Sequence, residues 1–340
     1  MKRRILGGTG ISVSEYALGA MMFSSWGDPD PDNGIRVIHA ALDAGINFVD
    51  TADVYGEGES EEIVGRALRG RRDEVVLATK FHSSMGPDAN HSGNSRRWLL
   101  RAVEDSLRRL DTDHIDLYQV HRPDPHTDID ETLSALSDLV RAGKVRAIGT
   151  SAFAAEQIVE AQWVAERRGH IRFRTEQPAY SILARDVERD VLPTASRYGM
   201  GVLTWGPLGA GWLSDKEIRP GIGRAKLEAD RFDLSNPANQ AKQAAVAELR
   251  KLAADAGMPL THLALNFVLA HPAVTSVLIG PRTPDQLTDL LAALPSTVDW
   301  SILDRIDQTV PPGTDLNPDD RRHTPPPLAD PTLRRRPEAH

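Results

Sequence analysis

The sequence predicts an α/β protein with a single closed (β/α)8 barrel, the TIM-barrel architecture. Short β-type runs alternate with helix-length amphipathic segments, and this β-then-α order repeats eight times along the 340-residue chain. Eight such units suit a closed barrel, whereas a doubly wound sheet usually contains fewer units before a second domain begins. Hydrophobic residues make up 40% of the chain and charged residues 26%, which is ordinary globular usage and excludes disordered and fibrous classes.

The expected elements follow from their apolar patterns and from the turn residues between them. Strands are expected at residues 16–18, 47–50, 75–80, 115–121, 147–151, 175–177, 201–205 and 274–279. Helices are expected at residues 33–44, 60–68, 96–109, 130–142, 154–168, 187–198, 240–256 and 284–293.

Three segments lie outside this repeat. Residues 11–14 alternate after a Gly-rich string at residues 7–10, which predicts an N-terminal β-hairpin that plugs the barrel floor. The long loop after the seventh strand, residues 206–239, exceeds a simple link and is a candidate lid. We expect residues 1–310 to form the barrel and residues 311–340, which contain eight prolines, to form a Pro/Arg-rich C-terminal tail.

Charge and cysteine content indicate the kind of partner. The formal net charge is -8, and a protein that binds nucleic acid or an anionic membrane more often carries the opposite sign. We therefore expect a small-molecule partner, with no nucleic acid and no membrane. The chain contains no cysteine, which excludes disulfides, thiolate metal sites and a cysteine nucleophile and fits a cytoplasmic protein. No metal site is expected.

No export signal or membrane span is expected. Glycines and Glu15 interrupt the apolar stretch that a signal peptide would need near the N-terminus. The uncharged run at residues 259–281 is long, but polar residues and the break at His271 and Pro272 divide it. We interpret this run as a buried helix followed by a buried strand.

Four polar side chains are expected at one rim of the barrel, because working residues of this fold lie at the C-terminal ends of strands. Asp50, Lys80 and His121 end the second, third and fourth expected strands, and Tyr55 lies in the Gly-rich loop after Asp50. Taken singly, each residue has an ordinary structural explanation, such as a turn cap. Lys80 is less easily explained, because only seven of the 40 basic residues are lysine.

Together these four groups suit proton transfer to a carbonyl oxygen. A buried lysine beside an aspartate holds a positive charge next to a phenol, which favours the phenolate and makes the phenol a usable general acid. The imidazole orients the carbonyl oxygen by hydrogen bonding. Another species must supply the hydride.

The stretch DTADVYGEGESE at residues 50–61 resembles the first signature of the aldo-keto reductases, and the resemblance covers residues 1–310. It implies a (β/α)8 barrel that binds a nicotinamide dinucleotide without a Rossmann domain. The implied catalytic tetrad is Asp50, Tyr55, Lys80 and His121, with Tyr55 as proton donor. The implied function is reversible, NADPH-dependent reduction of an aldehyde or ketone to an alcohol.

The same resemblance implies the residues that bind NADP(H). Ser151 and Gln177 match positions that hold the nicotinamide carboxamide, and Trp205 matches an aromatic that stacks on the nicotinamide ring. The phosphate and adenosine contacts match Pro207, Leu208, Gly209 and Ala210 beside the pyrophosphate, Lys216 and Arg224 in the belt over it, and Gly280, Arg282, Gln286 and Asp289 near the adenosine phosphate. There a helix N-terminus meets an anion, and Arg282 is expected to favour NADPH over NADH.

Two departures from the family pattern and two loop tryptophans complete the expected site. Ala152 stands where many members have Asn, so one amide partner is missing, and Leu290 replaces part of the adenine contact. Trp26 and Trp212 lie in rim loops and are expected to form substrate walls. Large aromatic side chains in loops also pack against their own loops, so that alternative stays open.

Two other functions compete with this interpretation. The Gly-rich string at residues 4–10 suggests a Rossmann oxidoreductase, but residues 11–14 alternate like a strand where that motif requires a helix. The second is a dinucleotide-binding, redox-sensing regulatory subunit with little turnover, as some members of the family are beside ion channels. The intact tetrad favours an enzyme. The sequence identifies neither the substrate nor the oligomeric state.

Overall fold

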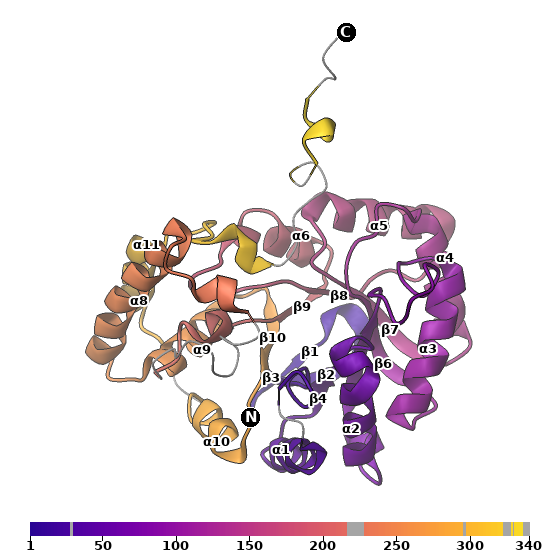
Figure 1. Ribbon diagram of the computed structural model, residues 1–340, viewed down its shortest axis with the longest axis horizontal. Coiled ribbons are helices and arrows are strands. Elements are labelled where there is room, and N and C mark those ends of the chain that lie inside the picture. The colour runs from indigo at the N-terminus through magenta and orange to yellow at the C-terminus, as the bar shows by residue number, and fades with distance from the viewer. Residues whose placement is uncertain (28–29, 216–227, 295–296, 322–327, 329, 336–340) are drawn as a thin grey trace.

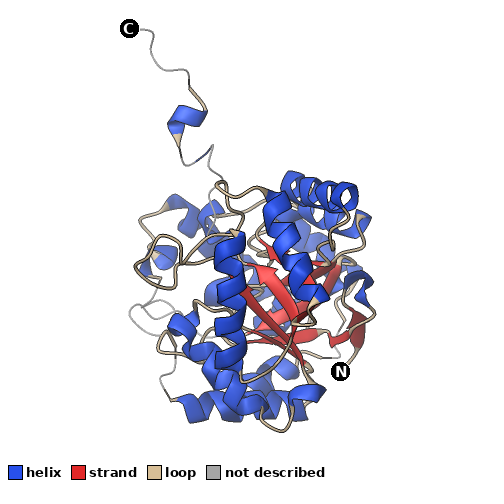
Figure 2. Ribbon diagram, turned by 90° about the vertical axis from the view of Figure 1, so that its right-hand side faces the viewer, coloured by secondary structure: helices blue, strands red, loops and turns tan. Residues whose placement is uncertain are grey.

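Eight parallel strands close into a barrel, with the helices outside them (Figures 1 and 2). The computed structural model describes residues 1–27, 30–215, 228–294, 297–321, 328 and 330–335. Around the barrel the strand order is β10-β3-β4-β5-β6-β7-β8-β9, so each strand pairs with its neighbour in sequence and β10 closes the ring against β3. The predicted (β/α)8 barrel is confirmed.

The strands agree with the eight predicted ones to within two residues at each end. They are β3 (Tyr16–Gly19), β4 (Phe48–Asp50), β5 (Val76–Phe81), β6 (Ile115–Val120), β7 (Val145–Ser151), β8 (Thr175–Gln177), β9 (Gly201–Thr204) and β10 (Val274–Ile279). The helices that correspond to predicted ones are α1 (Pro31–Asp43), α2 (Glu59–Leu68), α3 (Arg96–Leu110), α4 (Ile129–Arg141), α5 (Ala155–Arg168), α6 (Val191–Arg197), α8 (Pro237–Asp255) and α10 (Pro284–Leu291).

Helix starts follow the local sequence. The side chains of Asp30, Ser95 and Asp128 each accept a backbone N–H in the first turn of α1, α3 and α4. α9 (Leu260–Ala270) is the buried helix expected before β10, whereas α11 (Trp300–Thr309) was not predicted.

The N-terminal hairpin closes the floor of the barrel. β1 (Arg3–Ile5) and β2 (Ser12–Ser14) pair antiparallel, as predicted. Leu6 and Val13 are buried in a cluster with inward-facing barrel residues, namely Ala17, Phe48, Ala78, Leu117, Ala147 and Leu203. Gly7 has a φ of 53°, and a Cβ there would lie 2.3 Å from the carbonyl oxygen of Arg174, so the hairpin can approach this closely only with glycine.

The segment after α11 lies against the loop that follows β8. Leu316 N donates to Leu183 O at 3.0 Å, and the guanidinium of Arg185 donates to Val310 O and Asp307 Oδ1, both at 2.7 Å. The short helix η8 (Pro331–Leu333), further along the chain, lies apart from the barrel in both views (Figures 1 and 2).

Within the described residues, no single helix is long and apolar enough to cross a membrane. α8 and α9 are long and apolar enough only when they are taken together, and the chain bends by 90° between them. Most of α9 is buried within the protein.

Candidate active site

Three neighbouring strands bring the predicted polar residues together at the C-terminal rim. β4 ends at Asp50, Lys80 lies near the end of β5, and His121 directly follows β6. In the parallel registers Asp50 lies opposite Ala78 and Lys80 lies opposite Gln119. Because side chains alternate along a strand, Asp50 and Lys80 face inward above the packed floor.

Lys80 and Asp50 form a buried ion pair inside this rim. Both side chains are almost fully buried, and the Lys80 ammonium donates to Asp50 Oδ1 and, at 2.9 Å, to Thr51 O. Burial alone lowers the pKa of Lys80, but the charge of Asp50 and the phenol of Tyr55 outweigh it and raise the pKa above its ordinary value. Lys80 therefore remains a cation at any ordinary working pH.

Tyr55 lies close to both this cation and the imidazole of His121. It begins the short turn η2 (Tyr55–Gly58), whose backbone is left-handed at Gly56 and Glu57, with φ of 58° and 55°. The Tyr55 ring centroid lies 5.4 Å from Lys80 Nζ, and the ring meets that of His121 edge-on at a centroid distance of 5.8 Å. A left-handed glutamate is uncommon, and such backbone strain often accompanies functional sites.

The imidazole of His121 is neutral. Burial, assisted by the positive charges of Lys80 and Arg122, lowers the pKa of His121 well below its ordinary value. Its Nδ1 atom is buried and has no hydrogen-bond partner among the described residues. A neutral imidazole carries one N–H donor and one acceptor nitrogen, so the ring can hydrogen-bond a bound molecule without carrying a charge.

Gln119 is a site residue that the sequence reasoning missed. Its side chain is fully buried, and Nε2 donates to Asp50 Oδ2 at 3.0 Å. Gln177 Nε2 donates to the same oxygen at 2.9 Å and lies 3.3 Å from Gln119 Oε1. Asp50 thus receives hydrogen bonds from β5, β6 and β8. Gln119 was detectable, because it precedes His121 by two residues and so shares its face of the strand.

The residues expected at the nicotinamide carboxamide lie beside this network. Ser151 and Gln177 end the neighbouring strands β7 and β8, and Ser151 Oγ donates to Gln177 O at 2.8 Å. Trp205 directly follows β9 and is half-buried. Its backbone N–H donates to Pro178 O at 3.1 Å. The structure therefore brings Ser151, Gln177 and Trp205 to the same rim as Asp50.

The loop after Trp205 exposes backbone at this rim. Left-handed φ values occur at Gly206 (68°), Gly209 (55°) and Ala210 (60°). A Cβ placed on Gly206 would meet no atom within 4 Å, so open space lies beside it. The four residues expected near the pyrophosphate are half-buried or buried in this loop: Pro207, Leu208, Gly209 and Ala210. Lys216 and Arg224, expected in the belt over it, lie outside the described residues.

Three of the four residues expected at the adenosine phosphate, Gly280, Arg282 and Gln286, lie around the N-terminus of α10. Thr283 Oγ1 accepts from Gln286 N at 3.2 Å, and Gln286 Oε1 accepts from Arg282 N at 2.8 Å. Open space lies beside Gly280. Within the described part of the chain, the half-buried Arg282 guanidinium makes no ion pair. Asp289 lies near the other end of α10, where its backbone oxygen pairs with the ring of His262.

The two predicted substrate walls differ in placement. Trp26 is 39% exposed, and its ring centroid lies 6.0 Å from that of Tyr55, so it stands beside the tetrad. Trp212 is only 6% exposed, stacks on Phe232 at 5.7 Å, and has Lys242 Nζ 5.0 Å from its ring centroid. Phe232 belongs to the same loop, so Trp212 packs against its own loop, which is the alternative left open by the sequence, and its role as a substrate wall stays a prediction.

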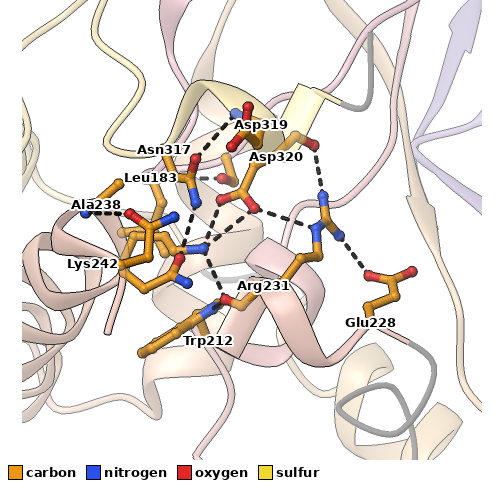
Figure 3. A network of polar contacts seen from close by, with 12 residues as sticks. Leu183, Trp212, Glu228, Arg231, Ala238, Lys242, Asn317, Asp319 and Asp320 are labelled. Atoms are coloured by element: carbon orange, nitrogen blue, oxygen red, sulfur yellow. Dashed lines mark hydrogen bonds and ion pairs between the residues drawn. The ribbon is translucent and has the colours of Figure 1, made fainter. Parts of the chain in front are cut away.

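Trp212 also belongs to a junction with the C-terminal segment (Figure 3). Its Nε1 donates to Arg231 O at 3.2 Å, within the loop after β9. Arg231 NH2 donates to Asp320 O at 2.6 Å, and Lys242 Nζ lies 3.0 Å from Asp320 Oδ2. Burial lowers the pKa of Lys242, which the carboxylate of Asp320 partly offsets. This network fixes the second half of the loop to the segment that follows α11.

No group of three or more histidine, cysteine, aspartate or glutamate residues in the described ranges is arranged to hold a metal ion. The groups that this rim presents are the Lys80–Asp50 ion pair, the Tyr55 phenol, the neutral His121 imidazole and the side-chain amides of Gln119 and Gln177. Such a set at the C-terminal end of a (β/α)8 barrel is the arrangement of a barrel oxidoreductase.

Comparison with known proteins gives the family. The model of the Aldo/keto reductase family matches residues 16–310. The uncharacterized oxidoreductase YrpG of Bacillus subtilis is 40% identical over 323 residues, which cover 92% of this chain and 96% of that protein. The aldo-keto reductase YhdN of the same organism is 38% identical over 304 residues, covering 86% of this chain and 88% of that protein.

A third relative is named as a channel subunit. A probable voltage-gated potassium channel subunit beta of Oryza sativa subsp. japonica is 36% identical over 308 residues, covering 86% of this chain and 91% of that protein. The chain belongs to the aldo/keto reductase family, as the resemblance at residues 50–61 indicated.

Proposed function

We propose that this protein is an NADPH-dependent reductase that converts an aldehyde or ketone to an alcohol in a reversible reaction, with Tyr55 as proton donor. The observation that carries the proposal is the proximity of Tyr55 to both the buried Lys80–Asp50 pair and a neutral His121. The proposed partner is a small carbonyl compound.

Each side chain of the site has a separate role in the proposed proton transfer. Tyr55 holds the proton on its hydroxyl and gives it to the carbonyl oxygen, and the Lys80 cation stabilises the phenolate that remains. Asp50 keeps Lys80 charged and in place, while Gln119 and Gln177 hold Asp50. The neutral His121 ring provides an N–H that orients the carbonyl oxygen. When bound, the nicotinamide supplies the hydride.

The chain offers a fitting set of residues for a nicotinamide dinucleotide. The open space beside Gly206 and Gly280 marks two points along the rim where a bound molecule would meet no obstruction. Ser151 and Gln177 would hold the carboxamide, and Trp205 would contact the ring. The loop of residues 207–210 would flank the pyrophosphate, and Gly280, Arg282, Gln286 and Asp289 the adenosine end.

We expect Arg282→Ala to weaken NADPH binding at least tenfold and to change NADH binding little. Arg282 directly precedes Thr283, the N-cap of α10, and its guanidinium has no ion-pair partner within the described residues, so it would be available to the 2′-phosphate that NADH lacks. One charge-assisted contact contributes about 1.5–3 kcal/mol, or roughly tenfold to a hundredfold in affinity. Titration of both dinucleotides by fluorescence measures the two Kd values.

Arg141→Ala is the matched control, because it removes the same charge from an exposed position on α4. It should leave both Kd values unchanged. An equal loss for NADPH and NADH in Arg282→Ala would show that Arg282 does not distinguish the cofactors, and the proposed preference for NADPH would then be wrong.

The second candidate function is a dinucleotide-binding regulatory subunit with little turnover. Its support is the 36% identity to a protein named as a potassium channel beta subunit. Steady oxidation of NADPH with a panel of aldehydes and ketones separates the two functions, since a regulatory subunit would bind the dinucleotide without sustained turnover. The tetrad with its buried ion pair favours the enzyme.

A further inference from the structure

Glu176 is a buried acid that the proposed proton transfer does not use. It lies in the middle of β8, between Thr175 and Gln177, and its side chain is fully buried. Gln177 points into the barrel toward Asp50, so the alternation of the strand turns Glu176 outward, away from the tetrad. A buried carboxylate is costly unless hydrogen bonds compensate, so its partners are informative.

The carboxylate of Glu176 holds the chain at both sides of the turn after β7. Thr150 Oγ1 donates to Glu176 Oε2 at 2.5 Å, and Phe153 N donates to Oε1 at 3.2 Å. The N–H of Ala152 donates to Gln177 O at 3.3 Å and also stabilises the carboxylate. The contacts at Thr150 and Phe153 lie on either side of Ser151 and Ala152, the two residues that form the turn.

Ala152 holds a strained position in this turn. Its φ is 57°, in the left-handed region that an alanine side chain disfavours and that glycine adopts freely. Ser151, directly before it, is the residue whose hydroxyl reaches Gln177 O. Because the sequence does not favour this backbone shape by itself, contacts from outside the turn must hold it, and Glu176 supplies them.

We propose that Glu176 is a positioning residue for the cofactor pocket: its ionised carboxylate holds Ser151 and Ala152 in the left-handed turn that presents Ser151 to the nicotinamide carboxamide. The inference rests on the proposed function, because it needs the dinucleotide to bind at this rim. Glu176 itself acts only through the turn.

The charge of Glu176 changes near neutral pH. Burial raises the pKa of Glu176 to about 7, although the hydroxyl of Thr150, the N–H groups of Phe153 and Ala152 and the positive charge of Arg122 after β6 all oppose the rise. Above this pH the carboxylate accepts these hydrogen bonds fully, and below it one oxygen carries a proton. The hydrogen bonds by which Glu176 holds the turn therefore weaken as the pH falls.

The free energy of unfolding depends on pH in the opposite sense to these hydrogen bonds. An unfolded chain ionises its glutamates near pH 4.5, so between about pH 4.5 and 7 the folded protein binds the extra proton at Glu176 and its stability falls as pH rises. A neutral glutamine of the same shape avoids this cost above pH 7. Glu176→Gln should thus bind the dinucleotide more weakly and yet unfold at a higher temperature.

The test measures the Kd for NADPH by fluorescence and the Tm of the full chain, for wild type and Glu176→Gln. At about pH 8.5 we expect roughly a tenfold weaker Kd in Glu176→Gln, the scale of one hydrogen bond to a charged group, with a Tm raised by a few degrees. At about pH 5.5 the two Kd values should converge. Titration of the dinucleotide's own phosphate cancels in this comparison.

Two further variants sharpen the result. Glu15→Gln, at a buried glutamate beside the N-terminal hairpin, should leave the Kd unchanged at both pH values. In an Ala152→Gly background the loss from Glu176→Gln should shrink, because glycine adopts the left-handed turn without help. Equal Kd values for wild type and Glu176→Gln at high pH overturn this proposal alone, as does a weaker Kd accompanied by a lower Tm. A wild-type chain that binds no dinucleotide overturns the proposed function as well.

Discussion

Tyr55→Phe is expected to lower turnover of a good aldehyde substrate by roughly 10²- to 10⁴-fold while leaving NADPH affinity nearly unchanged. The substitution removes the proton donor and little volume, and the Lys80 cation and the His121 ring remain in place. Steady-state oxidation of NADPH gives the turnover, and dinucleotide titration gives the affinity. The split between the two distinguishes loss of a proton donor from loss of a binding surface.

Tyr118→Phe is the matched control. Tyr118 is fully buried in β6, its ring stacks on Phe81 at 4.8 Å, and its hydroxyl has no hydrogen-bond partner among the described residues. Removing that hydroxyl should leave turnover unchanged. A Tyr55→Phe protein that retained more than about a tenth of wild-type turnover would remove Tyr55 from the role of essential acid.

Lys80→Met should produce the second large effect, on turnover and stability together. Turnover should fall by roughly 10²-fold or more, because the cation that stabilises the Tyr55 phenolate is lost. Stability should fall by about 3–5 kcal/mol, because Asp50 remains as a buried charge without its ion-pair partner. Denaturant unfolding and NADPH oxidation measure the two effects on one preparation.

The double variant Asp50→Asn with Lys80→Met separates these effects. Removing both charges should restore much of the lost stability, since the neutral amide no longer needs a cation, but turnover should stay low. The pKa of Lys80 is raised in the folded protein above the value of about 10.5 that it has in the unfolded chain. The Lys80 charge therefore contributes its full stabilisation below about pH 10.5, and this contribution is lost as the pH rises through the pKa of Lys80 in the folded protein. Recovery of turnover in the double variant would show that the Lys80 charge has no part in the chemistry.

The fold and the position of the tetrad were predictable because short-range patterns determine them. Strand-ending residues such as Asp50 and His121 could be assigned to one rim, since all eight barrel strands run parallel and end at the same side. The hairpin was predictable from alternation at residues 11–14 after a glycine string. The resemblance at residues 50–61 then indicated which of the rim residues are expected to act together.

The rest depended on contacts between distant segments. The contact of Gln119 with Asp50 depends on closure of the barrel, which brings the inward-facing amide on β6 to the carboxylate at the end of β4, across β5. The burial of Trp212 could not be decided from the sequence, because the ring contacts come from Phe232, further along the same loop, and from Lys242 in α8. Nothing in the sequence indicated a role for Glu176. Its carboxylate binds Phe153, 23 residues earlier in the chain, and the two residues meet only because β7 pairs with β8.

Transfer of deuterium from NADPH labelled at the hydride position tests the central claim most directly. The full chain is incubated with labelled NADPH and a panel of aldehydes and ketones, and mass spectrometry follows the products, with Tyr55→Phe run in parallel. The account predicts an alcohol that carries the deuterium on the former carbonyl carbon, formed by the wild type and reduced by orders of magnitude in Tyr55→Phe. Binding of NADPH without deuterium transfer to any carbonyl compound would contradict it and would favour the regulatory subunit instead.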